Sequence, residues 1–331
     1  MFRLCNLILQ VFLSAGWLVS VTHPSVAQDT QYPSRPVRII VPFAAGGPTD
    51  IAARIVADKL SKAWGQSVVV ESRPGGGSMI GAAAVANSSP DGYTMLFGPS
   101  SALIEAVLMS KDAPFDPIKS FAPVTEVYKL SAGLSINKKV PAANLKELIA
   151  LSRSKPLTYS SFGVGTGPHL LLETFKSAAG IDAVHVPYKG NVPGLAAVVS
   201  GEVDMTGAGL GTIRPHLKSG AQKQLAVDAE QESKHAPGVP TFKALGYPDV
   251  SGGTKFMAVW MPAGTPPAIV EKANAGIRAA LDSAEFKAFL DKFAYDKATA
   301  TTPQALADLV RTSLEHWRPV INSLKIGARQ Q

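Results

Sequence analysis

Apolar and polar residues alternate along the chain in a way that predicts repeated strand–loop–helix units. Residues 38–43 form an apolar run typical of a buried strand, and apolar positions after Pro48 recur at helical spacing as far as Gly65. The same alternation continues through both halves of the chain and predicts a mainly parallel α/β sheet. We expect further strands at 68–70, 94–97, 157–160, 183–186, 203–206, 224–227 and 255–261, and further helices at 79–86, 145–152, 169–179, 194–200, 213–218, 268–281 and 303–324.

Two α/β series, separated by an extended stretch at 123–137, share one kind of strand-to-helix junction. The first series runs into Ala45-Gly46-Gly47-Pro48 and the second into Gly165-Thr166-Gly167-Pro168. Each junction places Gly at the expected N-cap and Pro at the first helical position. Unpaired N–H groups at a helix N-terminus hold carboxylate or phosphate, so two such ends in two lobes would face an anion across a cleft. An ordinary tight turn is the alternative for either loop taken alone.

The N-terminus has the pattern of a secretory signal peptide. Arg3 is the only charge before the apolar run at 7–21, and small residues follow at Ser25-Val26-Ala27. We therefore expect residues 1–27 to be removed by cleavage after Ala27. A membrane anchor is the alternative, but the run is short and is interrupted by Gln10 and Ser14.

Composition narrows the classes of function. The chain has 331 residues, 46% hydrophobic and 17% charged, which indicates a globular protein. The net charge of +7 contains no run of five Lys or Arg, and aromatic residues make up only 7%, so nucleic acid is a poor candidate partner. Cys5 is the single cysteine and lies in the predicted signal peptide, which excludes a thiolate metal site, a cysteine nucleophile and a disulfide from the mature chain.

Sequence signatures of enzymes are missing. The chain has no GxSxG, HExxH or GxxxxGK[ST] motif. Asp50, at the third helical position, is expected to accept hydrogen bonds at the helix start in preference to contacting a ligand. His169 is expected to anchor its loop and not to bind metal, and Lys189 is either a counter-charge in the cleft or a solvated lysine.

Six ordered blocks resemble the Bug-type solute-binding receptors, the receptor family of the tripartite tricarboxylate transporters. The first is Pro42-Phe43-Ala44-Ala45-Gly46-Gly47-Pro48-Thr49-Asp50, similar to the family's PFxxGGxxD block. The others, which continue the match in order over nearly all of the mature chain, lie at 71–93, 159–169, 186–190, 201–204 and 262–266.

The resemblance implies a type II periplasmic-binding-protein fold: two α/β lobes joined by two crossing strands, with the ligand cleft between them. We expect lobe 1 to comprise residues 28–130 and 255–331, and lobe 2 residues 131–254. The resemblance further implies a monomeric periplasmic receptor without catalysis, cofactor or metal. Such a receptor closes on a small organic carboxylate and delivers it to a membrane permease. A receptor that signals to a membrane sensor, or an exported hydrolase using His169 with Ser161, are the alternatives.

The loop argument and the resemblance together give the candidate ligand-binding residues. In the family, backbone N–H groups of the two loops hold the ligand, and we carry this over position by position. The candidates are Phe43, Ala44, Ala45, Gly46, Gly47, Asp50, Ser100, Ser161, Gly165, Thr166, His169, Lys189 and Ala208. The chain departs from the family pattern at Ser72, Met205–Gly209, Asp228–Glu230 and Gly252–Met257, and the bare Gly207–Gly209 stretch is consistent with room for a bulkier ligand.

Overall fold

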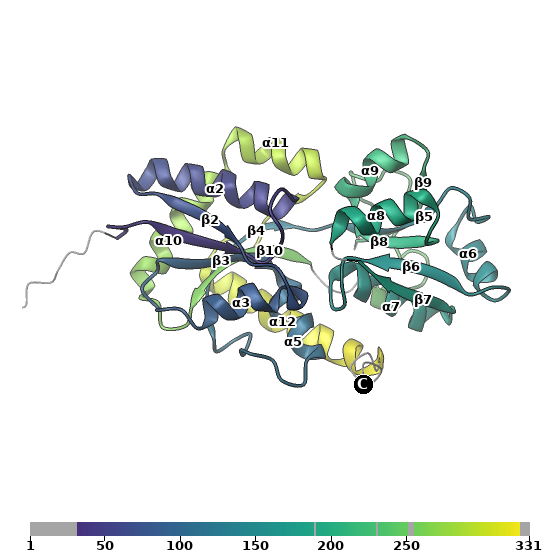
Figure 1. Ribbon diagram of the computed structural model, residues 1–331, viewed down its shortest axis with the longest axis horizontal. Coiled ribbons are helices and arrows are strands. Elements are labelled where there is room, and N and C mark those ends of the chain that lie inside the picture. Colours follow the sequence, from purple (N-terminus) through teal and green to yellow (C-terminus); the bar gives the residue numbers. More distant parts are fainter. Residues whose placement is uncertain (1–31, 189, 230, 251–254, 325–331) are drawn as a thin grey trace, which may run out of the picture. The chain divides into compact units, whose positions relative to one another are not determined.

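The computed structural model describes residues 32–188, 190–229, 231–250 and 255–324. The predicted signal peptide and Lys189 lie outside the described residues. Within them the chain forms two β-sheets, each covered by helices (Figure 1).

The first sheet has six strands in the order β11-β4-β10-β3-β1-β2. Strand β1 lies between β2 and β3 and runs parallel to both, whereas β10 lies between β3 and β4 and runs antiparallel to both. The strands are β1 (Val37–Val41), β2 (Val68–Ser72), β3 (Thr94–Pro99), β4 (Phe121–Lys129), β10 (Phe256–Pro262) and β11 (Asp296–Lys297).

The second sheet has five strands in the order β7-β6-β8-β5-β9. Strand β6 is parallel to β7 and β8, and β5 is antiparallel to β8 and β9. The strands are β5 (Ala132–Asn137), β6 (Leu157–Ser161), β7 (Ala183–Pro187), β8 (Met205–Gly209) and β9 (Gln222–Asp228).

Both sheets are mixed: β10 and β11 in the first sheet and β5 in the second run opposite to the other strands, which share one direction within each sheet. The parallel pairs lie within the two strand–helix series that the sequence pattern predicts, β1-α2-β2-α3-β3 and β6-α7-β7-α8-β8. The antiparallel pairs are those of β10 with β3 and β4, of β11 with β4, and of β5 with β8 and β9; β5 and β10 are the strands that the chain enters when it passes from one sheet to the other and back. The lobe boundaries at 130 and 255 stay a prediction.

The helices follow the predicted positions, with small shifts at their starts. Helices α8 and α9 begin three residues earlier than expected, and α4 and α5 were not expected because four or five residues show no helical period. The first sheet packs with α2 (Pro48–Trp64), α3 (Met79–Ala86), α4 (Ser100–Leu103), α5 (Glu105–Met109), α10 (Pro267–Leu281), α11 (Ala284–Phe293) and α12 (Pro303–Leu324). The second packs with α6 (Leu145–Ser152), α7 (Gly167–Ala179), α8 (Asn191–Ser200) and α9 (Leu210–Lys218), and 3₁₀ turns lie at Gly76–Ser78 and Pro248–Val250.

The central strands of the first sheet are buried on both faces, which explains their continuous apolar runs. Ile39 and Val41 of β1 face one core together with α2, α10 and α11, while Ile40 faces a second core with α3 and α12. In Figure 1, α2 and α11 are drawn above the strands of the first sheet, and α3 and α12 below them. The sheet is thereby fixed between two helical layers, and its loops emerge at defined places.

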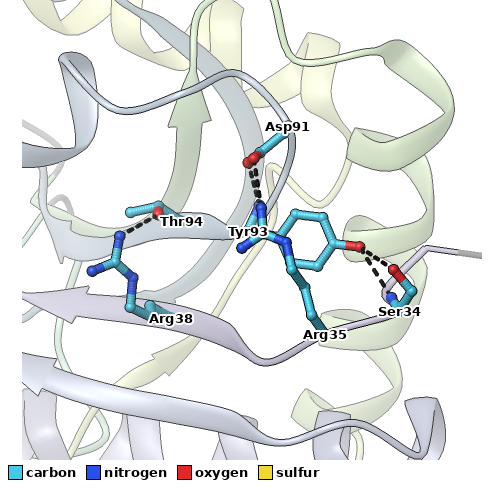
Figure 2. Close-up of polar contacts among 6 residues, drawn as sticks. All are labelled: Ser34, Arg35, Arg38, Asp91, Tyr93 and Thr94. Carbon is cyan, nitrogen blue, oxygen red and sulfur yellow. Dashed lines mark hydrogen bonds and ion pairs between the residues drawn. The ribbon is translucent and has the colours of Figure 1, made fainter.

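Polar contacts at the start of β1 hold the first described residues against the turn before β3 (Figure 2). The Arg35 guanidinium lies 3.7 Å from the ring centroid of Tyr93 and donates a hydrogen bond of 2.8 Å to Asp91. The Tyr93 hydroxyl accepts a hydrogen bond of 3.0 Å from the Ser34 backbone N–H. Each contact is exposed and contributes little by itself, but together they hold residues 34 and 35 beside the turn before β3.

Candidate functional site

The first candidate loop joins β1 to α2. Gly47 is the N-cap of α2 and Pro48 the first helical residue, as the sequence predicts. Gly46 has a φ of +86°, and a Cβ built there would have no heavy atom within 4 Å. Ala44, Ala45 and Gly46 are exposed, and Phe43 is half-buried, so this loop presents its backbone to the surroundings.

Asp50 holds this loop against the helix. Its side chain is almost fully buried, and Oδ2 accepts hydrogen bonds from Gly46 N–H at 3.0 Å and Arg54 Nε at 2.9 Å. Burial would raise the pKa of Asp50, but the hydrogen bonds from Arg54 and Gly46 outweigh it and lower the pKa below its ordinary value. The Gly46 N–H is thus taken by Asp50. Among the described residues, nothing accepts a hydrogen bond from the N–H groups of Gly47, Thr49 or Asp50.

The second candidate loop, residues 162–166, joins β6 to α7. The N-cap is Thr166, so Gly167 is the first helical residue and Pro168 the second, one position later in the helix than predicted. The reason is that Leu170 N–H already bonds to the Thr166 carbonyl and closes the first turn there. The Thr166 hydroxyl donates to the Gly163 carbonyl at 2.7 Å.

Ser161 and His169 lie beneath this second loop. The Ser161 Oγ is buried, lies 2.6 Å from His185 Nε2, and accepts a hydrogen bond from Gly163 N–H at 3.2 Å. His169 Nδ1 accepts a hydrogen bond from Gly165 N–H at 3.2 Å, which confirms its predicted role as a loop anchor. Ser161 therefore pairs with His185, whereas the hydrolase alternative had paired it with His169.

The other candidate residues occupy different surroundings. Ser100 is buried at the start of α4, directly after β3, and its Oγ accepts a hydrogen bond of 3.4 Å from Phe256 N–H. Ala208 is fully buried within β8, and Lys189 lies outside the described residues. A Cβ built on Gly165 would lie 2.7 Å from Met109 Cε, so the second loop is in close contact with the segment that follows β3.

Sequence reasoning missed a buried group of charges beside the second loop. Lys255 forms an ion pair with Asp228. The Cδ atom of Lys255 would lie 3.8 Å from a Cβ built on Gly167, at the start of α7. Glu105 is fully buried; burial raises its pKa to about 7, although the charge of Lys255 acts in the opposite direction. A single lysine next to an apolar strand gives no signal of burial, because most lysines are solvated.

Two further findings concern metals and membranes. Within the described ranges, no three His, Cys, Asp or Glu side chains are grouped so that they could hold a metal ion. In the same part of the chain, no helix has the length and apolar character that crossing a bilayer requires.

Comparison with known proteins identifies the family. The model of the family described as tripartite tricarboxylate transporter family receptor (TctC) matches residues 52–326. The chain belongs to this family. It is 35% identical over 301 residues to Protein BugT of Bordetella pertussis, an alignment covering 89% of this chain and 91% of BugT.

Solved structures agree with the family assignment. The receptor matches periplasmic binding protein BugD with a TM-score of 0.81 at 28% identity, over 89% of this chain and 99% of BugD. It matches R. palustris Rpa4515 with adipate at a TM-score of 0.80 and 31% identity, over 88% and 98% of the two chains. It matches MatC from Rhodopseudomonas palustris with bound malate at a TM-score of 0.79 and 28% identity, over 88% of this chain and 100% of MatC.

These matches establish the coarse function. The two mixed α/β sheets are the lobes of a type II periplasmic-binding-protein fold, and the protein is a solute-binding receptor of the TctC family. The family model describes transporter receptors, which places this chain in a solute-binding family.

Proposed function

We propose that this receptor captures a small dicarboxylate in the periplasm and delivers it to a tripartite tricarboxylate-type permease. The observation that carries the proposal is the likeness to Rpa4515 with adipate and MatC with malate, each over 88% of this chain. Both ligands carry two carboxylates on a short aliphatic chain. Export follows from the predicted cleavage after Ala27.

The two helix N-termini supply a physical basis for carboxylate binding. At α2, the N–H groups of Gly47, Thr49 and Asp50 have no acceptor among the described residues, and the helix dipole adds partial positive charge. We assign one carboxylate of the ligand to this end and the other to the loop at 162–166. Micromolar affinity requires about 8 kcal/mol, which several charge-assisted hydrogen bonds in a closed site could supply.

Closure follows in this proposal from contact with both loops. Only a ligand that interacts more favourably with one state shifts the balance between open and closed forms, and a dicarboxylate long enough to reach both loops does so. The closed form would then be recognised by the permease. Recognition by a membrane sensor is the second candidate, and a pull-down with the closed receptor separates the two partners.

A thermal-shift screen tests the ligand class. The receptor is unfolded and refolded to remove carried-over ligand, then heated with malate, adipate, citrate, monocarboxylates, aromatic acids, acidic amino acids and sugars. At a hundredfold excess over the dissociation constant, binding adds about 2.7 kcal/mol to the free energy of unfolding. A rise in melting temperature with dicarboxylates supports the proposal, and a rise only with uncharged solutes contradicts it.

Substitution of Gly46 tests the loop assignment. At φ +86°, valine is strained, although open space surrounds the position. Gly46→Val should therefore distort the first loop and abolish binding of the acid found in the screen. The matched control is Gly180→Val, because Gly180 also has a positive φ, +62°, with nothing within 4 Å, but caps the C-terminus of α7. If Gly46→Val binds the acid as tightly as Gly180→Val does, the assignment of the first loop to the binding site is refuted.

A further inference from the structure

The second loop rests on a column of three stacked rings. Tyr159 of β6, His185 of β7 and His169 of α7 lie one above another, with His185 in the middle. Its ring centroid is 4.8 Å from that of Tyr159 and 4.2 Å from that of His169, with interplanar angles of 18° and 30°. The strand register places Tyr159 directly opposite His185, and the first turn of α7 adds the third ring.

Each imidazole of this column holds one turn of the loop. His185 Nε2 contacts Ser161 Oγ at 2.6 Å. The Ser161 hydroxyl in turn lies within hydrogen-bond distance of the N–H and the carbonyl oxygen of Gly163. His169 Nδ1 accepts the N–H of Gly165 at 3.2 Å. Gly163 and Gly165 have φ values of +130° and +81°, so the loop has no regular secondary structure to maintain its shape. Its shape therefore depends on these side-chain bonds, together with the bonds that the Thr166 N–H and hydroxyl donate to the Gly163 carbonyl.

The charged groups that face the column come from α7. Glu173 accepts hydrogen bonds from the Tyr159 hydroxyl at 2.6 Å and from Lys176 Nζ at 2.9 Å. Burial lowers the pKa of His169, with Lys176 adding to this and Glu173 opposing it. Burial, then the neighbouring His169, lowers the pKa of His185 to about 4. Both rings are therefore neutral at pH 7, and the accepting Nδ1 of His169 carries no proton.

We propose that His169 and His185 are positioning residues for ligand binding, which fasten the loop at 162–166 in the shape that meets the ligand. Neither ring has to touch the ligand. The inference rests on the proposed function, because it takes this loop as one half of the dicarboxylate site. The inference predicts that removing His169 Nδ1 or His185 Nε2 loosens the loop. It also predicts that a side chain with a hydrogen-bonding group at the same place, but without the ring, restores the shape of the loop.

Amide hydrogen exchange in the ligand-free receptor tests the fastening. His169→Leu and His185→Leu remove the bonding nitrogen, while His169→Asn and His185→Gln place an amide near Nδ1 and Nε2 respectively. His216→Leu is the matched control, because it makes the same substitution in α9, a helix that packs with the second sheet. Losing one such bond should speed exchange of a peptide spanning 162–168 roughly tenfold. Exchange should stay near the unsubstituted rate in the Asn, Gln and control variants.

Calorimetric titration with adipate and with malate tests the effect on binding. We expect each Leu variant to weaken the binding of these acids roughly tenfold, and His169→Asn and His185→Gln to recover most of it. Should His169→Leu fail to fold, His169→Gln takes its place, since its amide lies one methylene too far out to receive Gly165 N–H.

The outcomes separate the two proposals. Exchange that is equal in the unsubstituted receptor and in both Leu variants overturns the fastening. Faster exchange with unchanged affinity for adipate and malate overturns the positioning role. If the unsubstituted receptor binds neither acid, the dicarboxylate proposal fails, while the exchange rates still decide whether the two histidines fasten the loop.

Discussion

Replacing Asp50 by alanine should destabilise the receptor far more than replacing Asp58, although both belong to ion pairs of the same spacing on α2. Asp50 pairs with Arg54, and Asp58 pairs with Lys62, each at i,i+4. The side chain of Asp50 is 4% exposed, against 53% for Asp58. Alanine has the higher helix propensity at both positions, so this benefit cancels in the comparison.

The magnitude follows from the contacts that each variant loses. Asp50→Ala removes a charge-assisted bond to Gly46 N–H, the pair with Arg54 and an acidic group in the first helical turn. Because Gly46 and Arg54 are then hydrated, the net loss is about 2 kcal/mol. Asp58→Ala loses an exposed pair that contributes about 0.5 kcal/mol.

Urea denaturation followed by circular dichroism measures both variants. We expect Asp50→Ala to lower the free energy of unfolding by about 1.5 kcal/mol more than Asp58→Ala at pH 7. The lowered pKa of Asp50 means that its stabilisation is present above the ordinary value of 3.8 and is lost as the pH falls through the folded-state pKa. The difference should therefore shrink below about pH 4. Equal destabilisation at pH 7 would refute the view that Asp50 fixes the first loop.

Three further predictions follow from buried contacts. Gly211→Ala should cost about 1–3 kcal/mol in urea denaturation, since its Cβ would collide with the backbone of Phe293, and a cost near zero would mean that α9 and α11 separate freely. Lys255→Met breaks the buried ion pair with Asp228 and should cost about 3–5 kcal/mol, whereas a loss below about 1 kcal/mol would contradict the buried pair. Because the pKa of His185 is lowered to about 4, unfolding free energy should fall as the pH drops from about 6.5 to about 4, and less so in His185→Gln; parallel pH profiles would count against this.

The sequence by itself determined the local elements and the position of both loops. Helices α3 and α6 begin and end at the predicted residues, and α12 begins at its predicted residue, because caps and apolar spacing act within a few residues. The N-cap of α6 shows this directly: Asn144 accepts the N–H of Glu147 at 3.0 Å. Both glycine-proline junctions were found for the same reason, and six ordered motifs along the chain indicated the family.

Only the tertiary structure decided which side chains meet. Sheet order and strand direction depend on where β5 and β10 insert, and no local pattern encodes this. Ser161 and His185 are 24 positions apart, and Lys255 and Asp228 are 27 apart, so their contacts exist only once the chain has folded. The loops were predictable because backbone geometry is local. Their fastening was not, because a hydrogen-bond partner is chosen by packing across the sheet and not by spacing along the chain.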